Sequence, residues 1–504
     1  MKLRILALCA LLGAAVFSIP VYDAGSFELF DGRVVIHGKI SQQALLKGRQ
    51  QNYDELHDID WFNIRTTFKL ETLWHAYAGP EYEVNFYAVW KNFYDAAHEA
   101  DSGYRNYLRD FSGHHGVEEV KSYETFRDIC RELYGEINHD LFQIRVGKQI
   151  VSWGETSFER MTDVINPIDS RGNLNPAYPD FDEIKRGLWM LRVFYTPVDM
   201  PADMTFEFVV IPDFQPDRLW PAGYPFGFTN PQFNSMQRPN EQFLGRYRDK
   251  PTKWTHPEFG IRIRGFTWGF DWTLLYFYHR NDQPVVKTGK AIKSMLPSLL
   301  GTGRTRDVYH YGWQNTFGLT FNKTVDRKIP IIPGTTCVMS GNVIRGEFIY
   351  EQDKDHNEIV GQNVRRAEHD RFAFVLGWDT KIFVPKLTPW ARNKLLSSST
   401  QLFMEWVPEK HRNDAIYPWV SKRKEGHHFA AVTQSFSYEL WNNRIRPGIY
   451  INYQITEGGG YYGPALGFSP TFGWNFIVRW LDFFDLGHGN NDMDFWTFEV
   501  TYEF

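Results

Sequence analysis

The sequence predicts an all-β protein: a transmembrane, antiparallel, up-and-down β-barrel of about 18 strands, with long outer loops and short periplasmic turns. Three observations lead to this fold class. Apolar and polar side chains alternate along many segments of the 504-residue chain. The chain starts with a basic and then apolar segment, and it ends with an aromatic, alternating segment. Connections between the segments are short and long in turn, as in barrels with both termini in the periplasm.

The amino-terminal segment has the organisation of a secretory signal peptide. Lys2 and Arg4 precede an apolar run over residues 5–17. This run is shorter than the roughly 20 apolar residues that a spanning helix needs. We therefore predict a signal peptide over residues 1–18 and an outer-membrane β-barrel over residues 19–504.

Composition narrows the classes of function. The formal net charge is −5, so no basic excess suggests nucleic acid as a partner. No later stretch is apolar enough for a transmembrane helix, and a closed barrel is the other structure that pairs its backbone groups within lipid. The aromatic content of 17% suits the interfacial girdles of such a barrel. Cys130 and Cys337 lie on or beside separate predicted strands, so we expect no disulfide between them.

Alternating segments can be followed from one end of the chain to the other. Residues 63–75 place Phe68 and Trp74 on one face and Arg65 and Lys69 on the other, because successive side chains of a strand point to opposite sides. The predicted strands are 33–46, 63–75, 83–94, 130–137, 141–152, 188–195, 204–211, 259–266, 270–279, 309–321, 338–350, 372–382, 401–406, 428–438, 445–454, 462–468, 474–484 and 496–504.

The connections give an independent check on strand number. Inner connections at 323–334 and 383–398 are longer than usual, so merging or splitting there would change the count to about 16 or 20 strands. A secreted propeller or β-helix also has many short strands, but those folds carry a fixed repeat, and the chain shows only a hairpin rhythm. Long outer loops are expected at 47–60, 95–127, 153–186, 212–258, 281–307, 351–370 and 407–427.

The last predicted strand carries a signal of its own. Trp496, Phe498, Tyr502 and Phe504 alternate with polar residues, and the final residue is aromatic. This pattern resembles the closing strand and assembly signal of Gram-negative outer-membrane barrels. The resemblance implies the barrel-assembly machinery as a partner, with Phe498, Tyr502 and Phe504 as the residues recognised.

The most distinctive block of the chain contains Gly147-Lys148-Gln149, Trp153-Gly154-Glu155 and Asn166-Pro167-Ile168-Asp169. Over residues 141–171 the sequence resembles a proteobacterial family of outer-membrane β-barrel proteins of unassigned function that carries these motifs. The resemblance implies an outer-membrane location and traffic of hydrophobic compounds, since members are often encoded near resistance-nodulation-division exporters. It supplies no catalytic residues.

The long loop after this strand is the predicted constriction of the barrel. A polar loop attached to the wall at both ends can fold inward, and carboxylates opposite guanidinium groups would set a transverse field. We expect Glu155, Asp169 and Arg171 to line the constriction, beside Trp153. The simpler alternative is that the loop forms ordinary turns and that Glu155 pairs with a wall arginine.

A second set of candidates lies on the polar faces of the predicted strands. These side chains should point into the lumen, because a charged side chain facing lipid would cost roughly 2–4 kcal/mol at the midplane. Interspersed glutamates suggest ion pairs that stiffen the wall, and a filter for anionic or amphipathic solutes is the alternative. The set comprises Arg65, Lys69, Arg145, Gln149, Arg262, Arg264, Arg345 and Arg446.

Metal sites and cofactors are not expected. Residues 353–357 begin like a calcium loop, but Glu358 and Val364 stand where that loop requires Gly and Glu, so a solvated outer loop is predicted. There is no Cys-x-x-Cys-His motif for haem. The aromatic, proline-rich stretch 214–243 is interpreted as a lid or plug for an apolar solute, or as packing over the barrel mouth.

These features predict a porin-like outer-membrane channel for passive passage of small hydrophobic or amphipathic solutes. Its expected partners are outer-membrane lipid, the assembly machinery and the solute, and the oligomeric state stays open. A scaffold barrel that sheaths a partner such as a cytochrome is the main alternative. An outer-membrane hydrolase is disfavoured, because the chain has no Gly-x-Ser-x-Gly motif, so no catalytic residue is predicted.

Overall fold

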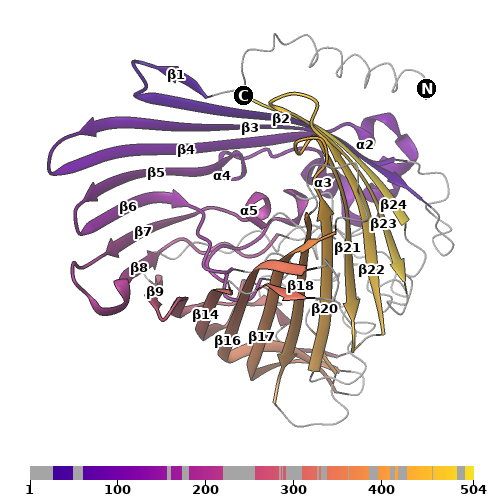
Figure 1. Cartoon of the computed structure of the whole chain (residues 1–504). Helices are drawn as coiled ribbons and strands as arrows, with labels where there is room; N and C mark the ends of the chain where they lie inside the picture. The colour runs from indigo at the N-terminus through magenta and orange to yellow at the C-terminus, as the bar shows by residue number, and fades with distance from the viewer. Residues whose placement is uncertain are drawn as a thin grey trace.

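The computed structural model describes residues 26–48, 61–155, 160–172, 181–218, 256–282, 285–286, 288–290, 309–325, 328–330, 338–360, 363–384, 395–408, 415–417, 428–456, 458–484 and 494–504. Within them, 18 antiparallel strands form a closed barrel, because the last strand pairs back to the first (Figure 1). The predicted fold class and strand number are therefore confirmed. The predicted signal peptide at residues 1–18 lies outside the described residues.

The barrel strands follow one another around the ring in chain order. They are β2 (Val34–Lys47), β3 (Trp61–Ala78), β4 (Tyr82–Asp95), β5 (Cys130–His139), β6 (Phe142–Gln149), β7 (Leu188–Tyr195), β8 (Thr205–Ile211), β9 (Glu258–Thr267), β10 (Phe270–Arg280), β14 (Trp313–Val325), β16 (Val338–Val360), β17 (Asn363–Phe383), β18 (Leu395–Trp406), β20 (His428–Tyr438), β21 (Ile445–Gln454), β22 (Gly459–Phe468), β23 (Trp474–Phe484) and β24 (Asp494–Glu503).

Shorter elements lie in the connections. The short strands are β1 (Phe27–Leu29), β11 (Val285–Val286), β12 (Thr288–Lys290), β13 (Tyr309–His310), β15 (Ile329–Pro330) and β19 (Ala415–Tyr417). The helices are α2 (Ala97–Ala100), α3 (Ser102–Lys121), α4 (Phe126–Ile129) and α5 (Phe181–Ile184), with 3-10 turns η2 (Ser170–Gly172) and η3 (Pro201–Asp203). No helix in the described part of the chain is long and apolar enough to span a membrane.

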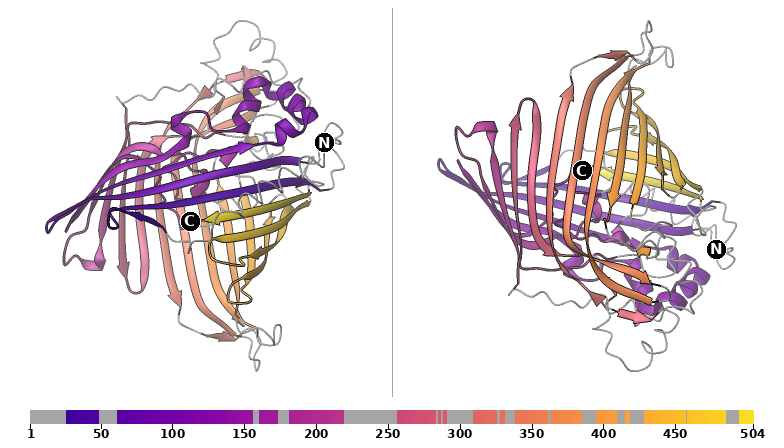
Figure 2. Two further views of the ribbon diagram at one scale, coloured as in Figure 1. Left: turned by 90° about the horizontal axis from the view of Figure 1, so that it is seen from above. Right: turned by 90° about the horizontal axis from the view of Figure 1, so that it is seen from below.

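The two faces of the wall differ as the alternation predicts. In β14, Phe317 and Leu319 point outward and are exposed, whereas Thr316 and Thr320 point inward and are buried. In β24, Phe498 is likewise exposed on the outer face. The barrel thus presents apolar side chains outside and mostly polar ones inside, which is the reverse of a soluble protein. Figure 2 shows this wall from two opposite sides, with its strands running obliquely around the interior.

One expected outer loop is wrong in part. Residues 351–370 are predicted as a loop, but β16 and β17 continue as a paired hairpin up to Val360 and Asn363, with a bulge near Asp353 that has a positive φ of 58°. Residues 353–357 therefore belong to a strand. The extension is polar on both faces, so it lacks the apolar alternation that marks a membrane strand, and backbone pairing with β12 and β19 holds it instead.

Another expected outer loop, 95–127, is a long connection in the structure and contains helices α2, α3 and α4. Asp101 caps α3 by accepting hydrogen bonds from the backbone N–H groups of Gly103 (2.8 Å) and Tyr104 (3.1 Å). Tyr104 and Val120 are buried beneath the helix. The helices lie at the end of the barrel opposite the short turns of the β3–β4 and β5–β6 hairpins (Figure 1).

Candidate functional site: a loop across the barrel interior

The described parts of the connection between β6 and β7, residues 150–155, 160–172 and 181–187, lie in the interior of the barrel and are called the inner loop here. Its α5 contacts β3, β4 and β5 through Glu183, and an earlier part contacts β16 through Thr162. In the ring of 18 strands, β3 and β16 are nine positions apart and so lie on opposite sides. The inner loop therefore crosses the lumen, with α5 drawn inside the ring (Figure 1).

Glu347 attaches the inner loop to β16, on the side of the barrel that is called the far wall here. Its buried carboxylate accepts hydrogen bonds from the backbone N–H of Glu155 (2.6 Å), the backbone N–H of Thr162 (2.9 Å) and the Thr162 hydroxyl (2.6 Å). Arg345, two residues earlier on the same face, donates to the Glu155 carbonyl (3.0 Å) and pairs with Asp379 at 2.9 Å. Hydrogen bonds to a charged acceptor are stronger than neutral ones, so this wall fixes the height of the loop.

An apolar stripe on the inner wall lies beside this anchor. Met161 of the inner loop packs against it, and residues on four neighbouring strands contribute to it. An apolar patch is unusual on the inner face of a barrel whose lumen is otherwise polar. The stripe consists of Ile349, Ala373, Val375, Phe403 and Ala431.

Glu183 of α5 attaches the inner loop to β3, β4 and β5, on the side of the barrel that is called the near wall here. Its carboxylate lies 3.0 Å from Lys69 Nζ, 2.7 Å from Lys91 Nζ and 3.3 Å from Arg131 Nη1. Burial raises the pKa of Glu183, but Lys91, Arg131 and Lys69 outweigh it and hold that pKa far below its usual range. The carboxylate is therefore ionised at neutral pH.

The beginning of the inner loop is packed against the wall between these anchors. Trp153 is buried, lies 6.1 Å from Phe277 between ring centroids, and donates from Nε1 to Glu207 (3.2 Å). Glu207 also binds Arg192 at 2.7 Å and Arg262 at 2.6 Å on the two adjacent strands. Trp153 and Arg262, both predicted to face the lumen, are thus part of a packed and fully paired cluster.

Asp169 and Arg171 do not face each other across the lumen as the constriction hypothesis expects. They lie two residues apart in the turn at η2, where Asp169 binds Arg171 Nη2 at 2.5 Å and Nε at 2.8 Å. Both are buried, and Asp128 and Arg218 extend the network with an ion pair of 2.7 Å. Because the two residues are neighbours in one turn, their side chains pair with each other instead of lying on opposite sides of the lumen.

This network makes stability depend on pH. Burial raises the pKa of Asp169, but Arg171 and then Arg218 hold it well below its usual range of about 4. A depressed carboxyl pKa contributes stability that is present above the unfolded pKa and is lost as the pH falls. We expect Asp169→Asn to lower the free energy of unfolding by about 3 kcal/mol at pH 7, with the difference shrinking below about pH 4. Urea titrations in detergent at both pH values measure this, and an equal difference at pH 7 and pH 2.5 would contradict it.

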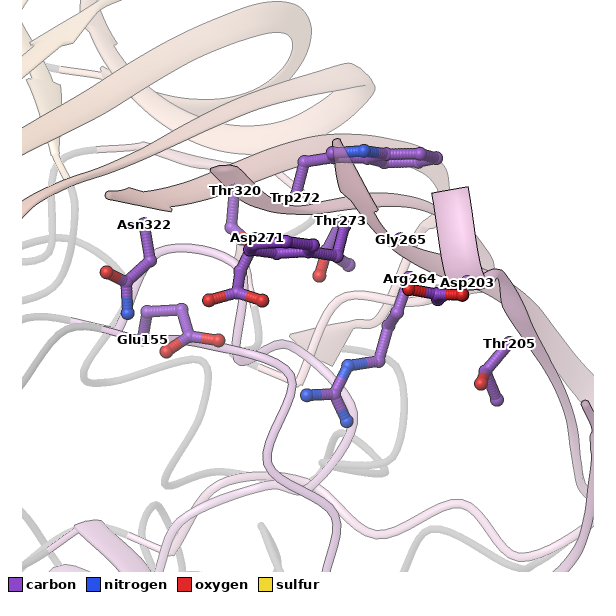
Figure 3. A pocket seen from close by; sticks show the side chains of 11 residues that line it. Glu155, Asp203, Thr205, Arg264, Gly265, Asp271, Trp272, Thr273, Thr320 and Asn322 are labelled. Atoms are coloured by element: carbon purple, nitrogen blue, oxygen red, sulfur yellow. The ribbon is translucent and has the colours of Figure 1, made fainter. Parts of the chain in front are cut away.

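Glu155 and Arg264 face a pocket of about 220 Å³ between the inner loop and the wall of β8, β9, β10 and β14. Figure 3 shows the Glu155 carboxylate, contributed by the loop, pointing into the same space as the Arg264 guanidinium and the Asp271 carboxylate of the wall. Thr205, Thr273, Thr320, Asn322 and Asp203 complete its polar lining. Glu155 and Arg264, which carry charges of opposite sign, thus line the same pocket from the loop and from the wall.

The remaining predicted residues lie on the wall. Arg145 pairs with Glu136 at 2.5 Å, and buried Gln149 donates to the Met190 carbonyl (3.2 Å). At the closing seam, the Phe504 ring packs directly against Gly38, so a side chain at position 38 would displace the ring.

In the outer face of β24, Tyr502 is buried rather than exposed. Its ring packs 4.8 Å from Trp474 on β23, between ring centroids. Nothing in this packing tests recognition by the assembly machinery. Most of the aromatic stretch 214–243 and Cys337 lie outside the described residues.

Three anchoring acids have different sequence signals. Glu207 and Glu347 sit at inward positions of predicted strands, so alternation places them in the lumen without naming their partners. Glu183 lies in a long connection with no periodic pattern, and no sequence signal marks it.

Comparisons with known proteins agree with the barrel fold. The crystal structures of OccAB4 and OccAB2 of Acinetobacter baumannii each match with a TM-score of 0.50. OccAB4 is 10% identical over 96% of this chain and 100% of its own, and OccAB2 is 8% identical over 95% of this chain and 99% of its own. At such identities the likeness shows the fold alone. No curated protein is detectably similar to this chain in sequence.

A family model covers nearly the whole barrel. The family described as "Protein of unknown function (DUF1302)" matches residues 47–504. This range includes the inner loop and both of its anchoring walls. The chain therefore belongs to the DUF1302 family.

Proposed function

We propose that this protein is a porin-like channel of the outer membrane through which small hydrophobic or amphipathic solutes pass down their gradient. The observation that carries the proposal is the inner loop, whose described parts contact the closed barrel at β3–β5 and at β16 and, with Glu155, line a pocket beside Arg264 that we take as part of the passage. A narrowed but polar lumen selects solutes by size and charge.

The outer surface supports a membrane location. Large apolar side chains, such as Trp74, Phe208, Leu274 and Phe374, are exposed around the barrel. Exposing so much apolar surface to water is unfavourable, whereas lipid tails accept it. A signal peptide over residues 1–18 and recognition of Phe498, Tyr502 and Phe504 by the assembly machinery would complete the route to that membrane.

The inner surface supports an amphipathic solute. The apolar stripe that includes Ile349 and Phe403 lies on one part of the inner wall, and Lys69, Lys91 and Arg131 lie on the opposite part. The inner loop covers both parts, with Met161 on the stripe and Glu183 on the cations, so each part becomes available to the apolar body or the charged end of a solute when that part of the loop moves aside. Since the inner loop already occupies the interior, the arrangement argues against a scaffold that sheaths a second protein.

Charge at the passage provides the test. We expect Glu155→Gln to shift ion selectivity toward anions and Arg264→Gln to shift it toward cations, each by roughly two- to fivefold in the permeability ratio, because each removes one of two opposed charges. Reversal potentials of refolded protein in planar bilayers under a salt gradient measure the ratio. A protein that does not conduct, or variants with unchanged reversal potentials, would overturn the proposal.

A further inference from the structure

The inner face of β3, β4 and β5 carries three cations at one height. Lys69 and Lys91 are direct partners in the β3–β4 register, and Arg131 follows at the start of β5. Like charges directly opposite each other destabilise a sheet, so a structural wall would avoid this pair. Lys91 and Arg131 are also buried, which adds a desolvation penalty. An arrangement of like charges that weakens the sheet in this way is expected at functional sites.

The acid that compensates these cations is contributed by the inner loop rather than by the wall alone. Glu183 contacts all three, and its backbone carbonyl accepts from Lys91 (3.1 Å) and Arg131 (2.7 Å). On the wall, Glu71 pairs with Lys69 at 2.7 Å. Glu132 of the same wall instead accepts from the backbone N–H of Ile150 at 3.0 Å. Lys91 and Arg131 therefore take their carboxylate partner from a separate segment, whereas Lys69 has a second carboxylate partner on the wall.

The way α5 is bound resembles the way a free ligand would be bound. The contacts of residues 182–185 with Lys91 and Arg131 use oxygen acceptors, namely the Glu183 carboxylate and the carbonyls of Asp182, Glu183 and Lys185. In the described residues, neither a disulfide nor backbone strand pairing links α5 to this wall. A solute carboxylate that replaced Glu183 would leave the charge of the site unchanged. The solute would lose its hydration while Glu183 regained its own, so the two desolvation costs would largely cancel.

We propose that Lys69, Lys91 and Arg131, together called the cation cradle, bind the carboxylate of an amphipathic solute and that Glu183 occupies this site when no solute is present. This inference rests on the proposed channel function and names the solute class as carboxylates. Glu183 acts as an internal competitor. The apparent affinity of the solute is reduced by the fraction of protein in which the cradle is open.

Binding of hexanoate and of its neutral analogue hexanamide tests the cradle without requiring transport. Equilibrium dialysis against the refolded full chain in neutral detergent, with empty micelles subtracted, gives both affinities. We expect Glu183→Gln to bind hexanoate at least about tenfold more tightly than the wild type, because the competitor is lost. Hexanamide should bind equally to both. Added salt should weaken the gain, since the contact is between charges.

Further variants separate the cradle from general loosening of the barrel. Lys91→Met or the milder Lys69→Gln, added to Glu183→Gln, should abolish the gain. Glu499→Gln, which removes a carboxylate paired with Arg479 on the β23–β24 wall, should bind hexanoate as the wild type does. Heat-modifiable gel mobility confirms that each variant is folded. A Glu183→Gln protein with unchanged hexanoate affinity, or with an equal gain for hexanamide, would overturn the inference.

The two proposals can fail independently. A wild-type protein that conducts ions while Glu183→Gln gains no hexanoate affinity removes the cradle and leaves the channel. A protein that shows the expected binding but no conductance supports the cradle as a carboxylate site and overturns the channel.

Discussion

Replacing Glu347 with alanine is expected to raise single-channel conductance severalfold. Glu347 accepts three hydrogen bonds from the inner loop, at Glu155 and Thr162, and is 2% exposed. Removing a buried charged acceptor and leaving its donors without a partner costs about 3–5 kcal/mol. That is enough to release the loop from the far wall in most molecules, because each 1.4 kcal/mol changes an equilibrium tenfold. The lumen would widen where the loop now crosses it.

Planar-bilayer recordings measure this change, and Glu351→Ala provides the matched control. Glu351 lies four residues further along β16 on the same face and is also buried, but it binds the wall residues Lys354 (2.8 Å) and Arg371. Its removal should lower stability without opening the lumen. Equal conductance of Glu347→Ala and the wild type would show that the far anchor does not hold the loop in place.

Replacing Glu207 with alanine is expected to be the most destabilising single change in the described wall. Glu207 is 1% exposed and lies between Arg192 and Arg262, and it also accepts from Trp153. Without it, two buried guanidinium groups face each other with no counter-charge. Breaking a buried ion pair by removing one partner costs about 3–5 kcal/mol, and here two pairs are lost.

Urea unfolding of refolded protein in detergent, followed by heat-modifiable mobility, measures this loss. Trp153→Phe is the comparison, because it removes one hydrogen bond and keeps the ion pairs, and its loss should be about 1–3 kcal/mol. Glu207→Gln should fall between the two. A Glu207→Ala protein as stable as Trp153→Phe would mean that water or another acid replaces the carboxylate.

Alternation predicted the barrel strands because burial in a barrel wall has a period of two residues. Thr316, Phe317 and Leu319 could be assigned to the correct faces from the sequence, as could Arg145 and Glu347. The extended β16–β17 hairpin was missed because its polar tip faces no lipid, so nothing selects an apolar face there. Helix α3 was missed because alternation with a period of two does not mark a helix, whose buried residues, such as Val117 and Val120, lie three or four positions apart.

The sequence by itself therefore determined the closed barrel, a count of about 18 strands with 16 and 20 left open, and the inward or outward direction of its side chains, because each of these follows from local periodicity. Only the tertiary structure decided what the inner loop binds. The contact from Glu155 to Glu347 spans 192 residues, and the contact from Lys91 to Glu183 spans 92. Alternation states that Lys91 and Glu347 face the lumen, but it cannot state which of the other strands, or which loop, meets them there. Closure of the ring sets those distances, and every strand contributes to it.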